Sequence, residues 1–456
     1  MLRSGRQSLP TPLLLKNWPR PLSDDSPSIP IDDLPSTYEE IKSNVEMTGN
    51  ILIRIVTWNQ EAREPPSSTD LSKLLFPNNK YHVIAVGTQE CENTFAKSII
   101  VPSKKHWEAT LEAAIGTDYD VIRSHALQAS HIILFVHKSM VHLISNVRSL
   151  AVPTGIGDTL GNKGGIGISF NIADSSCIFI NAHLGAHQHA TVRRTNEFRK
   201  ISCDMVTKML HRSDSETTSD SNSEDDYEEN DGECLRNNIH NSSNSEGCGG
   251  GIDYDNVDND EMDENNLLDD GDVLPNPPNH GILYPSSQHN DDLRTDSGPK
   301  TNPLVDTYDH VFWFGDLNFR INGTREVVDG MLENHMHDAL LCNDQLTMLM
   351  RFNRIFSGFA EGPLNFFPTY KFDHDSDHYD SSTRRRVPSW TDRILFKSNA
   401  NTQVLSYCSA PDIRTSDHRP VYATFKSRIS FSKDKEYEAP LWEIRRETKS
   451  EVCCIS

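Results

Sequence analysis

Short apolar runs rich in β-branched residues recur along the chain from Ile51 onward. They occupy residues 51–58, 82–90, 131–138, 177–184, 310–316, 392–397 and 419–425. Runs of this length and composition predict buried β-strands, and the polar stretches between them have the texture of helices. Because the runs keep ending in polar or charged residues, the pattern indicates stacked sheets with a functional site at the strand ends.

Three of the intervening stretches are predicted to be helical. In residues 103–115, the apolar residues Trp107, Leu111 and Ile115 recur at every fourth position, and Ser103 is placed to cap the first turn. Residues 189–211 and 335–351 are predicted to be helices as well. Short apolar runs and helix-like stretches therefore alternate along this part of the chain.

Three other segments lack this texture. Residues 1–48 are rich in Pro and Ser, and we expect a disordered leader. Residues 212–303 cannot bury enough apolar surface to offset the entropy of ordering, so we expect a disordered insert within one domain, 49–427. A linker between two domains is the alternative interpretation of this segment. Residues 428–456 form a charged tail.

The formal net charge of −22 suggests a protein that avoids polyanions, but the acidity is local. Residues 213–300 hold 24 of the 66 acidic residues and 3 of the 44 basic ones, which leaves 42 acidic and 41 basic residues elsewhere. The rest of the protein can therefore face an anionic surface. Nine scattered cysteines indicate a reducing compartment, without a disulfide framework or a zinc ribbon.

Polar and charged side chains directly follow or precede the predicted strands. They are Asn59, Glu90, His183, Asp316, Asn318, Asp392, Asp417 and His418. Each has a structural explanation when taken singly, since a Glu after a strand is usually solvated and an Asp before one often caps it. Together they supply carboxylates for a hard cation, amides that can hold oxygen atoms, and histidines that can meet phosphate.

Four motifs occur in order along the chain: FWFGDLNFR, FFPTYKF, YDSSTRRRVPSWTDRIL and TSDHRPVY. They resemble those of the inositol polyphosphate 5-phosphatases of the endonuclease/exonuclease/phosphatase superfamily, especially the prenylated type IV enzymes. The resemblance covers residues 51–427 apart from the insert. It implies a four-layer α/β sandwich of two packed mixed sheets. The implied activity is magnesium-dependent hydrolysis of the 5-phosphate of phosphatidylinositol 4,5-bisphosphate, the 3,4,5-trisphosphate or soluble inositol polyphosphates.

The resemblance also implies roles for the metal-site and water-site residues. Glu90 would bind Mg²⁺, with Asn59 beside it and Asp417 close to the metal. Asp316 would orient or deprotonate the attacking water, and Asn318 would hold the scissile phosphate. Magnesium prefers a few carboxylate oxygens together with water and substrate phosphate, which agrees with this set of residue types.

Two histidines complete the implied catalytic set. His183 and His418 would stabilise charge on the scissile phosphate, and Asp392 would pair with His418. Fixed donors of this kind meet the charge that develops during phosphoryl transfer. The sequence leaves the identity of the general base open.

Selectivity is expected in residues 366–393. In the family, Tyr370, Lys371, Arg384 and Arg386 occupy positions that grip the 4-phosphate of the inositol ring. Arg384 and Arg386 would point the same way if their segment is extended. Arg384 stands where lysine is usual, which keeps the charge and changes the geometry.

Two further departures concern the loops around the site. After Asn59 the chain reads Gln60-Glu61, where many relatives have a second Asn. The glycine-rich run 161–165 follows the wider family and not the type IV branch. Its Lys163 either reaches an inositol phosphate or is a solvated lysine on a tight turn.

Three other functional classes compete with this interpretation. A metal-dependent nuclease of the same fold is the second choice, but it needs a basic surface that a near-neutral body lacks. A cysteine phosphatase would use Cys408 and Arg414, yet Pro411 lacks an N–H and Asp412 repels phosphate. A catalytically dead lipid-binding scaffold would tolerate the loss of candidate catalytic residues. Because the full set of these residues is present, the sequence argues against a scaffold.

The final four residues, Cys453-Cys454-Ile455-Ser456, fit a C-a-a-X signal in which Cys453 is prenylated and the terminal serine favours farnesyl. No apolar run is long enough to cross a bilayer. We therefore expect a cytoplasmic monomer attached peripherally to the cytosolic face of a membrane. Its expected partners are phosphoinositide lipids or inositol polyphosphates, and not nucleic acid.

Overall fold

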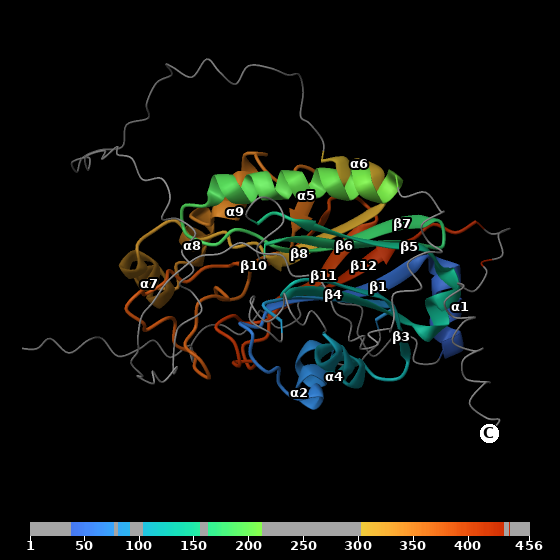
Figure 1. The fold of residues 1–456 in the computed structure, drawn as a ribbon, viewed down its shortest axis with the longest axis horizontal. Helices are drawn as coiled ribbons and strands as arrows, with labels where there is room; N and C mark the ends of the chain where they lie inside the picture. The colour runs from blue at the N-terminus through green and yellow to red at the C-terminus, as the bar shows by residue number, and fades with distance from the viewer. Residues whose placement is uncertain are drawn as a thin grey trace, which may run out of the picture. The chain divides into compact units, whose positions relative to one another are not determined.

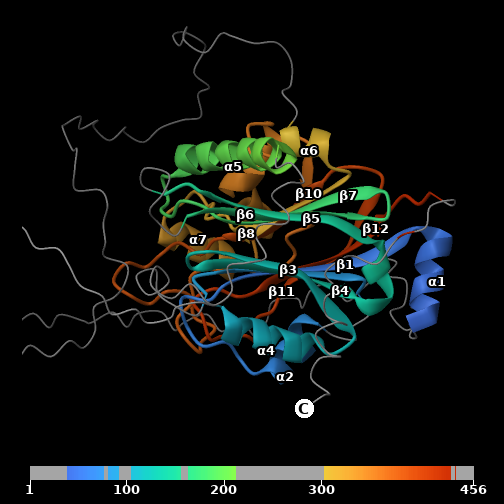
Figure 2. The ribbon, with the colours of Figure 1, turned by 45° about the vertical axis from the view of Figure 1, so that its right-hand side comes forward.

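The computed structural model describes residues 38–76, 81–91, 104–155, 163–211, 302–432 and 437. Two six-stranded sheets lie face to face, with helices on both outer sides (Figures 1 and 2). In chain order the elements are α1 (Tyr38–Thr48), β1 (Asn50–Asn59), α2 (Ser68–Leu75), β2 (Val83–Gln89), α4 (Lys105–Ile115), β3 (Tyr119–Leu127), β4 (Ser130–His137), η3 (Lys138–Leu143), β5 (Ile144–Pro153), β6 (Gly164–Ile172), β7 (Ser175–His183), α5 (Thr191–His211), α6 (Pro303–Thr307), β8 (His310–Asp316), α7 (Arg325–Glu333), α8 (His337–Cys342), α9 (Gln345–Arg351), β9 (Phe359–Glu361), β10 (Asp392–Lys397), β11 (Thr402–Ser409) and β12 (Val421–Arg428).

Both sheets are mixed. The first has the strand order β11-β12-β1-β2-β4-β3 and the second β5-β6-β7-β8-β10-β9. Strands β1 and β2 run parallel, as do β7 and β8, and the other paired strands are antiparallel. The pairing of β7 with β8 extends from Cys177 opposite His310 to His183 opposite Asp316. Strands that precede and follow residues 212–301 are therefore neighbours in one sheet.

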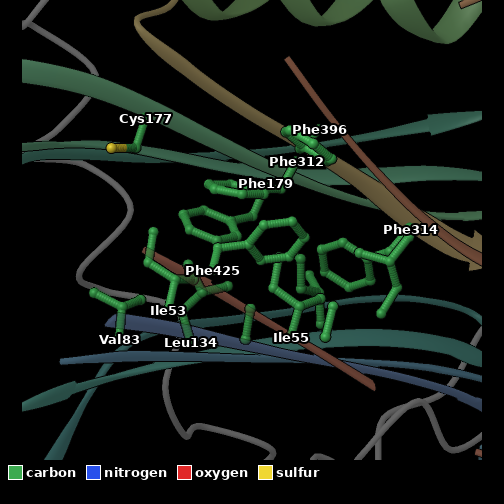
Figure 3. Packing of buried hydrophobic residues seen from close by; sticks show 14 of the residues in the cluster. Ile53, Ile55, Val83, Leu134, Cys177, Phe179, Phe312, Phe314, Phe396 and Phe425 are labelled. Atoms are coloured by element: carbon green, nitrogen blue, oxygen red, sulfur yellow. The ribbon is translucent and has the colours of Figure 1, made fainter. Parts of the chain in front are cut away.

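An aromatic and aliphatic core fills the space between the sheets. Figure 3 shows Phe179, Phe312 and Phe314 of the second sheet facing aliphatic side chains of the first. The rings of Phe179 and Phe312 stack with centroids 4.9 Å apart. Burial of large aromatic side chains is a dominant source of stability, so this layer holds the two sheets together.

Each outer face carries its own apolar layer. Trp58 and other residues of the first sheet pack against α2 and α4, and Trp58 meets Trp107 edge to face at 6.3 Å. On the second sheet, Trp313 packs against Phe198 of α5 at 5.0 Å. Because the central strands are covered on both faces, their sequences are continuous apolar runs. The predicted four-layer α/β sandwich is confirmed.

Seven strands were predicted, and all seven are present as β1, β2, β4, β7, β8, β10 and β12. The predicted helix 189–211 corresponds to α5, and the helix predicted at 103–115 begins at Lys105. Its N-cap residue is Lys104, without a side-chain cap, so the expected Ser103 cap is wrong. The single helix predicted over 335–351 is also wrong, because the chain forms α8 and α9 and breaks between them.

The break between α8 and α9 has a local cause in Asp344. Its side chain caps α9 by accepting a hydrogen bond from the N–H of Thr347 at 2.8 Å. The same carboxylate pairs with the buried Arg393 of β10 at 2.9 Å. Asn and Asp in a helix interior favour such caps and turns over continued helix.

The predicted leader is wrong in its last part. Residues Tyr38–Thr48 form α1, and Ile41 and Val45 on this helix are buried, with Val45 joining the core between the sheets. Residues 1–37, most of the predicted insert 212–303, most of the tail 428–456 and Cys453 lie outside the described residues. In the parts of the chain that the structure describes, no helix combines the length and apolar composition needed to cross a membrane.

Candidate active site

The candidate residues converge at one end of the two sheets, where β1, β2, β7 and β8 finish and β10 and β12 begin. His183 lies opposite Asp316, and Asp316 lies opposite Asp392 in the strand register. A Cβ added at Gly315 would lie only 1.9 Å from the carbonyl oxygen of Ala182, and its φ of +141° is rarely adopted by other residues. Gly315 is therefore what lets β7 and β8 place the imidazole of His183 beside the carboxylate of Asp316.

Asp316 is the most heavily bonded carboxylate of the site. Its Oδ2 accepts hydrogen bonds from the side-chain amides of Asn59 and Asn318, both at 3.1 Å, and lies 3.3 Å from Nε2 of His183. Burial alone would raise the pKa of Asp316. The His183 hydrogen bond and the nearby charges of His418 and Lys163 outweigh burial and hold this pKa well below its usual range.

The two amides that hold Asp316 have fixed orientations. Oδ1 of Asn59 accepts a hydrogen bond from the backbone N–H of Glu61 at 3.0 Å, so its Nδ2 faces Glu90 and Asp316. Oδ1 of Asn318 accepts from Nη2 of Arg320 at 2.5 Å. The sequence-based roles placed Asn59 beside the metal-binding Glu90. Here Asn59 presents its nitrogen to the carboxylates.

Asp392 and His418 form a buried pair. Nδ1 of His418 lies 2.9 Å from Oδ2 of Asp392, and that oxygen also accepts hydrogen bonds from the hydroxyls of Thr369 and Thr391. Burial would lower the pKa of His418. The charges of Asp392 and Asp417 outweigh burial and raise this pKa to about 10. His418 is therefore an imidazolium at neutral pH and can donate to a phosphate oxygen.

A divalent cation fits at Glu90. This side chain is about one-third exposed, lies 3.3 Å from Asn59 and 3.9 Å from His183, and has a φ of +50° that is uncommon for a non-glycine residue. One or two carboxylates with water and substrate oxygens are what Mg²⁺ takes, and Glu90 beside the ionised Asp316 supplies them.

A second group of candidate ligands is present in the described part of the chain, namely Asp316, Asp392 and His418, whose donor atoms lie within 4.8 Å of one another. All three side chains are buried, and Nδ1 of His418 already pairs with Oδ2 of Asp392 at 2.9 Å. This group fits proton and charge handling better than metal binding, and Glu90 remains the better anchor for a cation.

Lys163 is drawn into the site. Its Nζ contacts Nε2 of His183, and burial lowers the pKa of this lysine although Glu90 and Asp316 raise it. The alternative of a solvated lysine on a turn is therefore wrong.

Tyr370 and Lys371 also border the site. Nζ of Lys371 forms an ion pair with Oδ2 of Asp417 at 3.1 Å. The ring of Tyr370 lies 4.5 Å from the ring of His418. Asp417 is thus tied to the lysine predicted to bind substrate, and its other oxygen lies 3.8 Å from Nε2 of His418.

Arg384 and Arg386 lie on a turn. The N–H of Arg385 donates to the carbonyl of Ser382 at 3.1 Å, and Arg385 has a φ of +40°. The expectation that Arg384 and Arg386 share one face of an extended segment is therefore wrong. Asp380 holds the turn by accepting from the N–H of Arg386 at 2.6 Å, and its own N–H donates to the carbonyl of Lys371, so the turn stays next to Lys371.

Two residues of the site were not assigned from the sequence. Arg320, the last residue of FWFGDLNFR, contacts Asn318 and lies over the ring of Tyr370 at 4.4 Å. Glu61 lies 3.5 Å from His374, and burial together with the charge of Asp417 raises its pKa to about 7. Each follows a predicted site residue by two positions, Glu61 after Asn59 and Arg320 after Asn318, and this spacing could have indicated them.

Comparisons with known proteins agree with this arrangement. The model of the Endonuclease/Exonuclease/phosphatase family 2 matches residues 56–234 and 283–424. The human phosphatidylinositol polyphosphate 5-phosphatase type IV is 28% identical over 403 residues, which cover 84% of this chain and 47% of that protein. The polyphosphatidylinositol phosphatase INP53 of Saccharomyces cerevisiae is 27% identical over 420 residues, 89% of this chain and 29% of that protein.

The chain therefore spans about half the length, or less, of these curated relatives. A solved structure of the inositol polyphosphate 5-phosphatase domain of SPsynaptojanin, in complex with inositol (1,4)-bisphosphate and calcium ion, matches with a TM-score of 0.57. The identity is 24%, and the match covers 91% of this chain and 98% of that one. This likeness shows the shared fold.

Proposed function

The chain belongs to the Endonuclease/Exonuclease/phosphatase family 2, and from this membership and the geometry of the site we propose that it is a phosphoinositide 5-phosphatase. The substrates would be phosphatidylinositol 4,5-bisphosphate, the 3,4,5-trisphosphate or the corresponding soluble inositol polyphosphates. One observation carries the proposal: an ionised Asp316, held by two oriented amides, lies between Glu90 and the His418–Asp392 pair. The similarity to named 5-phosphatases supports the choice of substrate class.

We assign the following roles in the reaction to residues of the chain. Asp316 orients the attacking water, and its low pKa makes it a better orienting group than a proton acceptor. The protonated His418, held by Asp392, donates to the phosphate as negative charge develops. His183 lies next to Asp316, and its proposed role is to stabilise charge on the phosphate. Glu90 would hold a divalent cation, which we propose to be Mg²⁺, and the bound ion would supply charge to polarise a phosphoryl oxygen.

Recognition of the inositol ring is assigned to the neighbouring loops. Lys371 and Tyr370 lie beside Asp417 and His418, within reach of a phosphate next to the scissile one. The turn that carries Arg384 and Arg386 is hydrogen-bonded to Lys371 through Asp380 and brings two more cations to this side. We propose that these residues bind the 4-phosphate.

The decisive experiment measures phosphate release from short-chain phosphatidylinositol 4,5-bisphosphate with Mg²⁺ and with EDTA. EDTA should abolish turnover, and Asp316→Asn should lower kcat by about 10³-fold or more, since the orienting carboxylate is lost. Asp70→Asn, an exposed carboxylate at the start of α2, is the matched control and should leave kcat unchanged. Undiminished turnover in Asp316→Asn would remove Asp316 from the mechanism, and hydrolysis of duplex DNA in place of lipid would favour the nuclease.

We further propose attachment to a membrane through a prenyl group on Cys453, with the protein acting as a monomer. This proposal rests on the sequence alone, because residue 453 lies outside the described residues. One lipid chain anchors only marginally, so binding of the catalytic domain to substrate lipid would contribute the rest. Cys453→Ser should move the protein from the membrane to the soluble fraction of cells; unchanged membrane association would show that the anchor lies elsewhere.

A further inference from the structure

Arg320 is a buried cation without a counter-ion in the described parts of the chain. Its residue surface is 6% exposed, and no carboxylate lies within ion-pair distance of it there. Arg393, which is fully buried, is paired with Asp344 at 2.9 Å and with Glu361 at 2.6 Å. Burying a guanidinium without an anion is costly, and a phosphate group bound at Arg320 would supply the counter-charge that the described residues do not.

The guanidinium of Arg320 is held rigidly by two neighbours. Nε donates to the carbonyl of Asn318 at 3.1 Å, Nη2 donates to the side-chain Oδ1 of Asn318 at 2.5 Å, and the group stacks on Tyr370 at 4.4 Å. Nη1 makes no hydrogen bond to the described residues. It is also not one of the described polar atoms that are both fully buried and unpartnered, so its surface is partly accessible. The Nη1 donor of this fixed guanidinium can therefore bind a ligand.

Asn318 cannot itself supply that donor. Both hydrogens of its amide are committed, one to the carbonyl of Leu184 at 3.0 Å and one to Oδ2 of Asp316 at 3.1 Å. Turning the amide over would set its nitrogen against Nη2 of Arg320, donor against donor. Asn318 was expected from the sequence to hold the scissile phosphate. Here both of its amide hydrogens are donated within the protein, one of them to Asp316.

We propose that Arg320 binds the scissile phosphate through Nη1, and that Asn318 positions Asp316 and does not contact the phosphate. This inference rests on the proposed phosphatase activity. A guanidinium is always charged and matches the geometry of phosphate oxygens, and its tie to Asn318 places it one hydrogen bond from the group that orients the water. A cation fixed there stabilises the charge that develops in the transition state.

The first test compares Arg320→Met, Arg320→Lys and the matched control Arg54→Met. Arg54 is also buried, also stacks on a tyrosine ring, at 3.9 Å from Tyr422, and donates to the carbonyl of Leu75, but it faces α2 on the outer side of the first sheet. Arg320→Met should lower kcat by about 10²–10³-fold, the range for loss of one transition-state donor. Arg320→Lys should recover part of that loss, and Arg54→Met should lower the thermal midpoint without lowering kcat of the folded enzyme.

The choice of substrate separates the scissile phosphate from its neighbour. The loss in Arg320→Met should be equal on phosphatidylinositol 4,5-bisphosphate and on phosphatidylinositol 3,5-bisphosphate, which lacks the 4-phosphate. A loss confined to the 4-phosphorylated lipid would overturn the assignment, because Arg320 would then read the 4-phosphate. Unchanged kcat on both lipids would also overturn it.

Binding of inorganic phosphate gives a readout that does not depend on turnover. In EDTA, millimolar phosphate should raise the thermal midpoint of the wild type and of Arg54→Met, and the affinity should fall about tenfold or more in Arg320→Met. The protein could bind inorganic phosphate in an Arg320-dependent way and yet hydrolyse no inositol phosphate. That result would support the anion site and contradict the proposed function. If phosphate protects Arg320→Met as well as wild type, or protects neither, the anion site is wrong.

Discussion

At the scale of single residues, the pair of Asp392 and His418 shows how one carboxylate sets the charge of a buried histidine. Two hydroxyls and the imidazole converge on Oδ2 of Asp392, and the pKa of His418 rises to about 10 despite burial. The folded state therefore binds one more proton than the unfolded state between the unfolded pKa of about 6.5 and about 10.

This pair predicts a stability profile with a defined sign. The stabilisation from His418 is complete below about pH 6.5 and is lost as the pH rises through about 10, at up to about 1.4 kcal/mol per pH unit. Asp392→Asn removes the main counter-charge, so its free energy of unfolding should fall less between about pH 7 and about pH 9.5 than that of the wild type. Urea unfolding at the two pH values measures the difference, with the partly exposed Asp377→Asn as control. Equal slopes in wild type and Asp392→Asn would contradict the ion pair.

Residue types at strand ends could be read from the sequence, whereas their orientations could not. Glu90, His183 and Asp316 stand out because each follows an apolar run, and the structure brings them together. The direction of the Asn59 and Asn318 amides depends on the N–H of Glu61 and on the guanidinium of Arg320. Contacts of that kind leave no periodic signal, so the sequence could not show that the amide of Asn318 donates to Asp316.

At the scale of elements, strands buried on both faces were predictable and half-exposed strands were not. In β1 every residue after the first is buried, but β3 and β5 mix buried and partly exposed positions. Their sequences therefore lack a continuous apolar run, and a bulge in each shifts the register and interrupts the alternation. The strand β6 is buried but begins with two glycines, which weaken its strand signal.

The break between α8 and α9 predicts an outsized cost for one substitution. Asp344→Ala removes the cap of α9 and leaves Arg393 with Glu361 alone in a fully buried position. Breaking a buried pair from one side costs about 3–5 kcal/mol, and loss of the cap adds about 1 kcal/mol. Denaturant unfolding should show a loss of this size, against a small one for Asp70→Ala at the partly exposed start of α2. A loss below about 1 kcal/mol would mean that Arg393 finds another partner.

At the scale of the whole molecule, the catalytic domain is assembled across residues 212–301. The helix α5 ends at His211 and α6 begins at Pro303, and Nδ2 of Asn302 donates to the hydroxyl of Ser202 on α5 at 3.3 Å. The pairing of β7 with β8 joins the same two parts of the chain. These contacts join the two parts of the chain through described residues on either side of the acidic segment.

Deletion of residues 215–300, with the ends joined by a short flexible linker, should leave turnover on soluble substrate nearly unchanged. The free energy of closing a loop varies only slowly with its length, and the site residues named among the described parts of the chain all lie outside this segment. Removal of its negative charge should tighten binding to vesicles of anionic lipid. Sedimentation with vesicles and phosphate release measure the two effects, and an insoluble or inactive deletion protein would show that the segment is structural.

The pairing of β1 with β12 has a consequence for how the protein comes into being. Strand β1 leaves the ribosome long before its partner on one side, from Val421 to Arg428, has been synthesised. Until then β1 has an open edge, a surface that invites wrong strand pairing and calls for chaperone protection. Asp392 and His418 are synthesised shortly before β12, long after β1. The site and the first sheet are therefore completed together, only after β12 has been made.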